Sequence, residues 1–187
     1  MEKLYAYVDE TGQDTQGTLF LLAVVVVGDE RDILLRWLEN VEYETGKHLR
    51  SWHKSSHRVR IAYIDRIIES PRFRDAIFYA VYHEARAYRD LTLLTIAKAL
   101  GTRMGSQRYR ATVVIDGLQR GEVRGVAVGL RRIRVPVHKV RGARDESNAL
   151  VRLADAMAGF LRTAEEGDAE WRERLGRAVA RGIICRV

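Results

Sequence analysis

Residues 19–28 form the longest apolar run of the chain, with the sequence LFLLAVVVVG. The run falls well short of the roughly 20 apolar residues that span a bilayer, and it predicts a buried β-strand. Residues 3–9, KLYAYVD, are rich in aromatic and apolar side chains and predict a strand before it. A short turn cluster, GQDTQG, separates the two segments. The chain therefore opens with a predicted β-hairpin whose second strand covers 18–27.

Hydrophobic spacing after the hairpin predicts helices that alternate with strands. The predicted elements are helices at 30–44 and 59–68, a strand at 75–83, a helix at 91–100, a strand at 109–116, a helix at 121–132, a strand at 133–140, and helices at 148–163 and 169–181. Pro136 places the 133–140 strand at a sheet edge or a bulge. A hairpin followed by this alternation predicts an α/β fold, with a mixed β-sheet flanked by helices.

Length and composition predict one globular domain over residues 1–187. Hydrophobic side chains make up 47% of the chain and charged ones 30%, and we find no repeat, low-complexity tract or linker. The N-terminal sequence MEKLYAYVDE lacks the basic start and long apolar middle of a signal peptide. The single cysteine, Cys185, excludes an internal disulfide and a thiolate zinc cluster. We therefore expect a cytoplasmic protein that does not enter a membrane.

Positive charge is concentrated in residues 120–144, which hold eight Arg or Lys and one acid, Glu122. This segment carries a charge of +7, equal to the net charge of the whole chain. A concentrated basic stretch is typical of proteins that bind a polyanion, because each neutralised phosphate releases counterions. We therefore predict that nucleic acid, either DNA or RNA, is bound through Arg131, Arg132, Arg134, Lys139 and Arg141. The alternative is a solvated basic face in an arginine-rich chain.

Two predicted strands end in an aspartate after mostly apolar residues: Asp9 ends KLYAYVD, and Asp116 ends YRATVVID. Ligand-binding and catalytic groups gather at strand ends in α/β sheets, because the sheet holds them rigidly while the loops open space around them. Two such carboxylates lie side by side if their strands are neighbours. They would then repel each other, and a bound cation is the usual reason that a fold tolerates this.

A third acidic feature runs from Asp145 into the predicted helix at 148–163. At about 100° per residue, Asp155 shares a polar stripe with Arg152, roughly opposite the apolar face of this helix, and Gly159 follows one turn later. Small neighbours would leave space around the Asp155 carboxylate for an ion or a phosphate. Simpler roles remain open: a strand-end Asp is a common turn residue, Asp145 or Ser147 suits a helix N-cap, and Asp155 suits an exposed position.

Five segments, in order along the chain, resemble a known family. They are YVDETG at 7–12, WHKSSHR at 52–58, VID at 114–116, DES at 145–147 and LADAMAG at 153–159. The pattern resembles family 3800 of domains of unknown function, a ribonuclease H-like group with an opening D-E-[ST]-G motif and a closing D-x-S…AD-x-x-AG helix. Thr11 in place of serine keeps the hydroxyl group. The sequence Val-Arg-Leu at 151–153 replaces the usual Leu-Gln pair and adds charge near the proposed site.

The resemblance implies a ribonuclease H-like mixed sheet and a set of acids that hold a divalent metal. Hard oxygen ligands select Mg²⁺ or Mn²⁺. Glu10 is a secondary candidate, because strand alternation points its side chain to the face opposite that of Asp9. Carried over by motif, the metal ligands are Asp9, Asp116, Asp155 and, less directly, Asp145, and the first three would also be catalytic.

The segment around residues 52–58 has two open interpretations. Lys54, His53 or His57 could contact the scissile phosphate or assist proton transfer, with Lys54 the catalytic candidate. Equally, these side chains could belong to a solvated basic loop. Trp52 could stack on bases or lie in the core.

These observations predict a metal-dependent nuclease or resolvase. Two ions about 3.5–4 Å apart would activate a water and stabilise the leaving oxygen of a phosphodiester, with Asp9 bridging them. The alternative is a non-catalytic module that binds nucleic acid or a partner on the same fold. A transposase or integrase fragment is disfavoured, because helix-turn-helix spacing is absent. A resolvase would require a homodimer, since such enzymes use two active sites.

Overall fold

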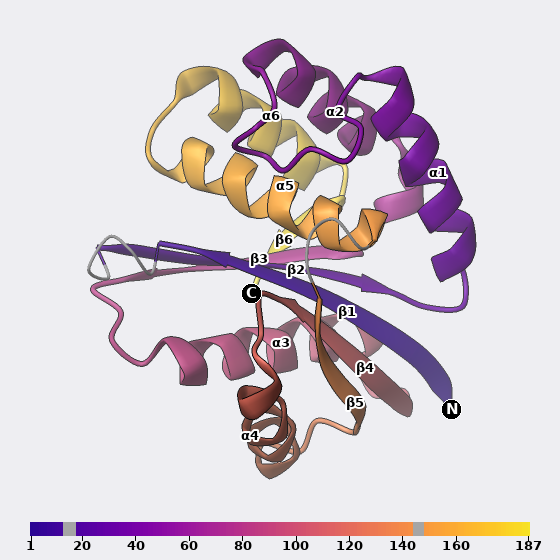
Figure 1. The fold of residues 1–187 in the computed structure, drawn as a ribbon, viewed down its shortest axis with the longest axis vertical. Coiled ribbons are helices and arrows are strands. Elements are labelled where there is room, and N and C mark those ends of the chain that lie inside the picture. Colours follow the sequence, from indigo (N-terminus) through magenta and orange to yellow (C-terminus); the bar gives the residue numbers. More distant parts are fainter. Residues whose placement is uncertain (13–17, 144–147) are drawn as a thin grey trace.

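The computed structural model describes residues 1–12, 18–143 and 148–187 (Figure 1). Within these residues one six-stranded sheet has the strand order β5-β4-β1-β2-β3-β6. Its strands are β1 (Glu2–Thr11), β2 (Leu19–Val27), β3 (Ile77–His83), β4 (Tyr109–Asp116), β5 (Val137–Ala143) and β6 (Ile184–Arg186). The helices are α1 (Arg31–Glu44), α2 (His57–Glu69), the 3₁₀ turn η2 (Pro71–Phe73), α3 (Tyr88–Met104), α4 (Arg120–Arg132), α5 (Ala149–Glu165) and α6 (Ala169–Ala180).

The sheet is mixed. Strand β2 runs antiparallel to both of its neighbours, β1 and β3, whereas the pairs β1–β4, β4–β5 and β3–β6 are parallel. The opening hairpin is the β1–β2 pair, with Tyr7 opposite Val25. Because β1, β3, β4 and β5 all run the same way, their carboxyl ends lie at one edge of the sheet. This edge is where the strand-end acids of β1 and β4 are placed.

Helices cover both faces of the sheet (Figure 1). Helices α1, α2, α5 and α6 lie on one face, and α3 and α4 lie on the other. Alternate residues of each central strand belong to separate cores: in β1, Tyr7 packs on the α5 side, and Ala6 and Val8 pack on the α3 side. Strand β2 is buried on both faces from residue 20 to residue 27, which explains its unbroken apolar sequence.

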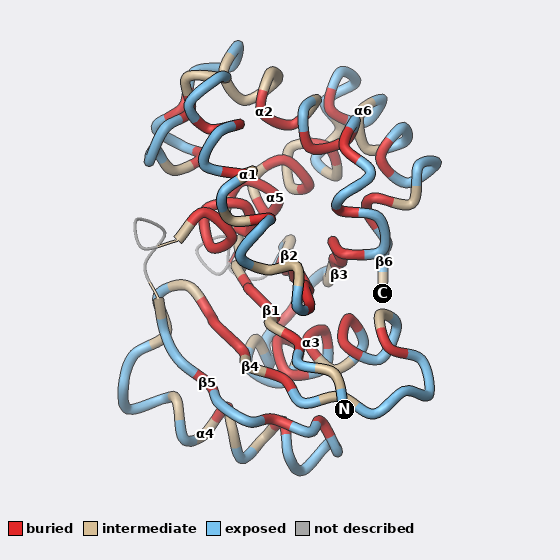
Figure 2. Tube along the Cα trace, turned by 90° about the vertical axis from the view of Figure 1, so that its right-hand side faces the viewer, coloured by how far each residue is buried: buried red, intermediate tan, exposed pale blue. Residues whose placement is uncertain are grey.

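Burial is uneven across the sheet (Figure 2). Helix α5 is almost wholly buried between the sheet and the helices above it, while much of α4 and β5 is exposed. Strand β5 is an edge strand, and its register with β4 shifts between Ala111 and Thr112. Both features agree with the edge or bulge predicted from Pro136.

Two differences from the predicted elements stand out. Strand β5 begins at Val137, after Pro136, rather than at 133, because residues 133–135 form the turn that follows α4, in which Arg134 has a positive φ of 64°. Strand β6 was not predicted, because three residues carry too little periodicity to be recognised and its ladder forms only with β3. In the part of the chain that the structure describes, no helix combines the length and apolarity needed to cross a membrane.

Candidate active site

Asp9 and Asp116 lie next to each other at the carboxyl edge of the sheet. Strands β1 and β4 are parallel neighbours with Val8 opposite Ile115, so the next residue on each strand is an aspartate. Tyr7 and Val114, two residues earlier on their strands, both belong to the core beneath α5. Since side chains on a strand alternate, Asp9 and Asp116 face the same side, toward α5.

Helix α5 brings Asp155 to the same place. Burial raises the pKa of the Asp9 carboxyl well above its ordinary value, and the negative charges of Asp155 and then Asp116 raise it further. The Glu10 N–H opposes this shift by donating to Asp9 Oδ1 at 2.8 Å. The Trp52 N–H donates to Asp155 Oδ2 at 2.7 Å and holds that carboxylate in place. The Asp9 carboxylate on β1 therefore interacts through its charge with one carboxylate from α5 and one from β4.

The chemistry of these donors fits a hard divalent cation. Carboxylate oxygens are the ligands that Mg²⁺ and Mn²⁺ prefer, and a cation would offset the repulsion that raises the pKa of Asp9. Among residues 1–12, 18–143 and 148–187, however, no three His, Cys, Asp or Glu side chains form a ready-made metal cluster. Asp145, the fourth predicted ligand, lies outside the described residues.

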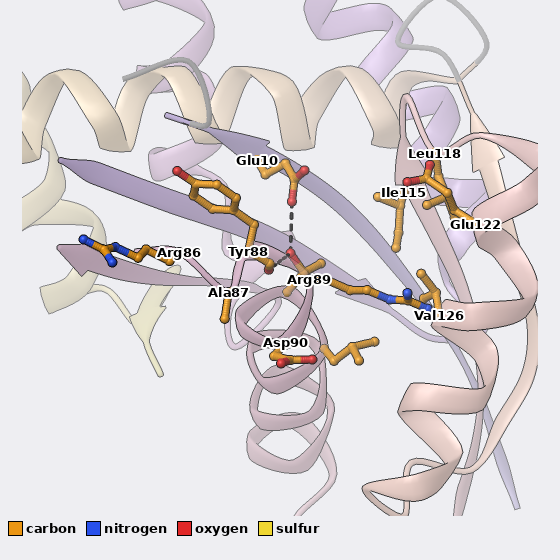
Figure 3. Close-up of a pocket in the computed structure, with 12 residues that line it drawn as sticks. Glu10, Arg86, Ala87, Tyr88, Arg89, Asp90, Ile115, Leu118, Glu122 and Val126 are labelled. Carbon is orange, nitrogen blue, oxygen red and sulfur yellow. Dashed lines mark hydrogen bonds between the residues drawn. The ribbon is translucent and has the colours of Figure 1, made fainter. Parts of the chain in front are cut away.

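Glu10 faces the other side of the sheet, as strand alternation predicts. Its carboxylate accepts a 3.0 Å hydrogen bond from Thr92 Oγ1 on α3. It points into a pocket of about 490 Å³ that also includes Tyr88 and Glu122 (Figure 3). Burial raises the pKa of Glu10, and Glu122 contributes to the rise. Glu10 is therefore separated by the sheet from the three aspartates.

The space predicted beside Asp155 is filled by Trp52. A Cβ on Gly159 would overlap the indole ring of Trp52, so the glycine lets this ring pack against α5. The Trp52 side chain is only 3% exposed, and its ring packs edge-on against Trp171 at 5.4 Å between centroids. Trp52 is a core residue whose backbone N–H positions Asp155. The expectation of an open space for an ion at Gly159 was wrong.

Gly159→Ala is expected to destabilise the protein by about 1–3 kcal/mol, because the new methyl group displaces the Trp52 ring. Gly176→Ala on α6 is the matched control, since a Cβ there meets no neighbour and Ala favours a helix. Urea unfolding followed by tryptophan fluorescence measures both variants. Equal stability of Gly159→Ala and the wild type would contradict the packing role of this glycine.

Arg152 forms a buried ion pair with helix α1. Its side chain is buried and makes a two-pronged contact with Glu42 of α1, with Nε 2.8 Å from Oε1 and Nη2 2.6 Å from Oε2. Lys47 Nζ lies 3.5 Å from the same carboxylate. The side of α5 that the helical wheel predicts to be polar is thus packed against other elements, and it carries a buried ion pair.

The histidines and lysine of the 52–58 segment are exposed at its surface. His57 is held by α6, because its Nε2 lies 3.1 Å from Glu170 Oε2 and its ring packs on Trp171. His53 and Lys54 directly follow Trp52, whose N–H binds Asp155. The structure therefore links this segment to the acidic site through the backbone of Trp52.

The basic residues after position 120 divide into two groups. Arg131, Arg132 and Arg134 are exposed at the end of α4, on the face of the sheet that α3 and α4 cover. Lys139 and Arg141 lie on β5, where Arg141 is opposite Val114, two residues before Asp116. Arg141 thus shares the α5 side of the sheet with the aspartates.

A contact between two further residues on that side, Arg31 and Tyr7, could not be recognised from the sequence. Arg31, at the start of α1, donates from Nε to the hydroxyl of the buried Tyr7 at 2.7 Å. Only the packing of α1 over β1 makes this contact recognisable.

Comparisons with known proteins identify the fold. No protein-family model matches the chain, and no curated protein matches it by sequence. Among solved structures, the ribonuclease H2 from Pyrococcus horikoshii OT3 matches with a TM-score of 0.58 and 14% identity, over 92% of this chain and 77% of that one. A chain in the PCNA:RNase HII complex from Archaeoglobus fulgidus matches with a TM-score of 0.50 and 18% identity, over 97% and 91%. The chain therefore has a ribonuclease H-like α/β fold, as predicted.

Proposed function

We propose that this chain is a divalent-metal-dependent nuclease or resolvase that hydrolyses phosphodiester bonds in nucleic acid. The observation that supports this most strongly is the environment of Asp9, a largely buried carboxyl whose pKa is raised further by Asp155 and Asp116. Like charges gathered in such a place are unfavourable unless a cation offsets them. The ribonuclease H-like fold supports nucleic acid as the substrate class.

In this proposal Asp9, Asp116 and Asp155 hold Mg²⁺ or Mn²⁺, and Asp145 is a further ligand. The metal supplies an activated water and offsets the charge that develops on the leaving oxygen. Asp9 interacts with both other aspartates, so it is the proposed shared ligand. The Trp52 N–H keeps Asp155 oriented toward this group. Lys54, two residues further along the same segment, is proposed to contact the substrate phosphate.

Metal binding is the first test. Mn²⁺ at about 100 times its dissociation constant is expected to stabilise the wild type by about 2.7 kcal/mol, a rise in Tm of roughly 5–10 °C. Asp116→Asn removes a proposed ligand and is expected to lose most of this rise. Asp29→Asn is the matched control, because Asp29 is exposed at the turn before α1. Thermal unfolding with and without Mn²⁺ measures all three proteins.

Cleavage is the second test. Labelled single-stranded and duplex DNA, RNA, RNA–DNA hybrid and a four-way junction are incubated with Mn²⁺ and each protein. Wild type and Asp29→Asn are expected to yield products from at least one substrate, and Asp116→Asn is not. A wild type without a Tm shift and without products would refute the proposal and favour a non-catalytic binding module. Size-exclusion chromatography with light scattering tests the homodimer that a resolvase requires.

A further inference from the structure

A basic groove lies beside the aspartates on the same side of the sheet. It has a volume of about 910 Å³ and lies among β1, β4, β5 and the first turns of α1, α4 and α5. The described residues that line it include three arginines, Arg31, Arg120 and Arg141, and none of them is an Asp or a Glu. The described part of the groove therefore presents positive charge next to a negatively charged site.

Arg31 is held in place by aromatic residues of β1. Its Nε donates to the Tyr7 hydroxyl at 2.7 Å, and its guanidinium carbon lies 5.0 Å from the centroid of the Tyr5 ring. Its Nη1 is 2.6 Å from the carboxylate of the exposed Asp32. Tyr7 is completely buried on the central strand β1, so the hydroxyl that orients Arg31 is itself held in place by packing. A guanidinium has five N–H donors, and these bonds engage two of them.

Arg141 approaches the groove from the edge strand. It is opposite Val114 in the β4–β5 register, and Val114 packs on the α5 side, so the Arg141 side chain is on that side as well. Within the described residues Arg141 forms no ion pair, and it is exposed. A fixed Arg31 and an exposed Arg141 thus line the same groove from opposite sides.

The spacing along β1 between the groove residue Tyr7 and Asp9 suits a polymer with regularly spaced charges. Tyr7 precedes Asp9 by two residues on β1, a separation of about 7 Å at roughly 3.3–3.4 Å per residue. A nucleic-acid strand in a duplex rises about 3.4 Å per nucleotide. A strand whose reacting phosphate is at Asp9 would therefore place a phosphate one or two nucleotides away in the groove. Guanidinium groups bind phosphate oxygens with two parallel hydrogen bonds.

We infer that Arg31 and Arg141 form a phosphate-binding subsite, which holds a backbone phosphate of the nucleic-acid strand one or two nucleotides from the bond at the aspartates. The position of the reacting bond rests on the proposed function, whereas binding of the backbone phosphate does not. The subsite fixes the register of the strand and carries no base specificity, because phosphate contacts do not read sequence.

Binding without metal tests the subsite by itself. The affinity of a fluorescent oligonucleotide is measured in EDTA over a series of salt concentrations for wild type, Arg31→Gln and Arg141→Gln. Each variant is expected to bind the oligonucleotide about 5–10-fold more weakly than wild type at low salt. The slope of log K against log salt is expected to be shallower than that of wild type by roughly one. Arg36→Gln is the matched control, because Arg36 is an exposed arginine on the same helix as Arg31. Wild-type slopes in both Arg31→Gln and Arg141→Gln would overturn the inference.

A neutral phosphate analogue locates the contact. Single methylphosphonate linkages are placed in turn along the oligonucleotide, and one position is expected to weaken binding to wild type but not to the Arg31→Gln/Arg141→Gln double variant. If no position shows this difference between wild type and the double variant, the inference is also overturned. Failure of the subsite is distinguishable from failure of the proposed function. Altered salt slopes in the arginine variants without any cleavage by wild type would support the subsite and refute the nuclease. Cleavage by wild type with unaltered salt slopes in the variants would support the nuclease and refute the subsite. Circular dichroism confirms that each variant is folded.

Discussion

Asp9→Asn is expected to make the metal-free protein more stable while it abolishes Mn²⁺-dependent cleavage. The carboxyl is poorly solvated and is repelled by Asp155 and Asp116, so its ionised form is unfavourable in the folded state. An amide of nearly the same shape removes the charge and keeps the packing. Substitutions that relieve such sites typically add about 0.5–2 kcal/mol to the free energy of unfolding.

The gain is expected to depend on pH. Because the folded-state pKa of Asp9 is raised above the unfolded value, near 3.8, ionisation lowers stability as pH rises toward and through the folded-state pKa. Below the unfolded-state pKa the carboxyl is protonated in both states, so its burial beside the other aspartates does not lower the free energy of unfolding. The stability of Asp9→Asn relative to wild type should therefore be small near pH 3, grow as pH rises, and be largest above the folded-state pKa of Asp9.

Urea unfolding in EDTA at several pH values measures this difference, and a cleavage assay with Mn²⁺ measures activity. Asp29→Asn provides the control for both. A variant that is less stable than wild type at neutral pH would contradict the repulsion among the three aspartates. Undiminished cleavage by Asp9→Asn would contradict the proposed role of Asp9 in holding the metal.

Arg152→Met is expected to destabilise the protein by about 3–5 kcal/mol, the largest effect on stability that we predict. It leaves the buried Glu42 carboxylate without the guanidinium that contacts both of its oxygens. Breaking a buried ion pair costs this much because an uncompensated charge remains in the interior. Lys47 offsets only part of the loss, since its Nζ is 3.5 Å away and burial lowers its own pKa.

The exposed pair Arg66–Glu44 provides the matched control. Its atoms are also 2.6 Å apart, but the side chains are 49% and 54% exposed. Arg66→Met is therefore expected to cost no more than about 1 kcal/mol. The double variant Glu42→Gln/Arg152→Met removes the uncompensated charge and should recover part of the loss. A cost for Arg152→Met as small as that for Arg66→Met, by urea unfolding, would contradict this account.

The arrangement of Asp9 and Asp116 could be inferred from sequence because it follows from local patterns. Each aspartate ends a mostly apolar strand, and period-two alternation places Glu10 on the face opposite Asp9. The sheet order that makes β1 and β4 neighbours is not a local property. The sequence left that order open, because the element pattern and the family resemblance implied only a ribonuclease H-like mixed sheet, and the structure supplies the order.

The surroundings of α5 could not be inferred in the same way. A helical wheel treats a helix as having one buried face, whereas α5 packs on the sheet below and on α1 and the Trp52 segment above. Arg152 was therefore placed on a polar stripe, although its partner Glu42 is 110 residues earlier in the chain. Likewise, nothing near Gly159 in sequence indicates that the indole of Trp52 occupies the space beside it.

The origin of the three aspartates also has a consequence for how the chain is held together. They come from the first strand, the fourth strand and a helix near the end of the chain, and the single cysteine leaves no internal disulfide to join these parts. A divalent ion shared by the three side chains would act as a removable cross-link between the beginning, middle and end of the polypeptide. The entropy lost in closing such long loops grows only slowly with their length. Because the three side chains belong to distant parts of the chain, the bound ion would stabilise the entire domain rather than one part of it.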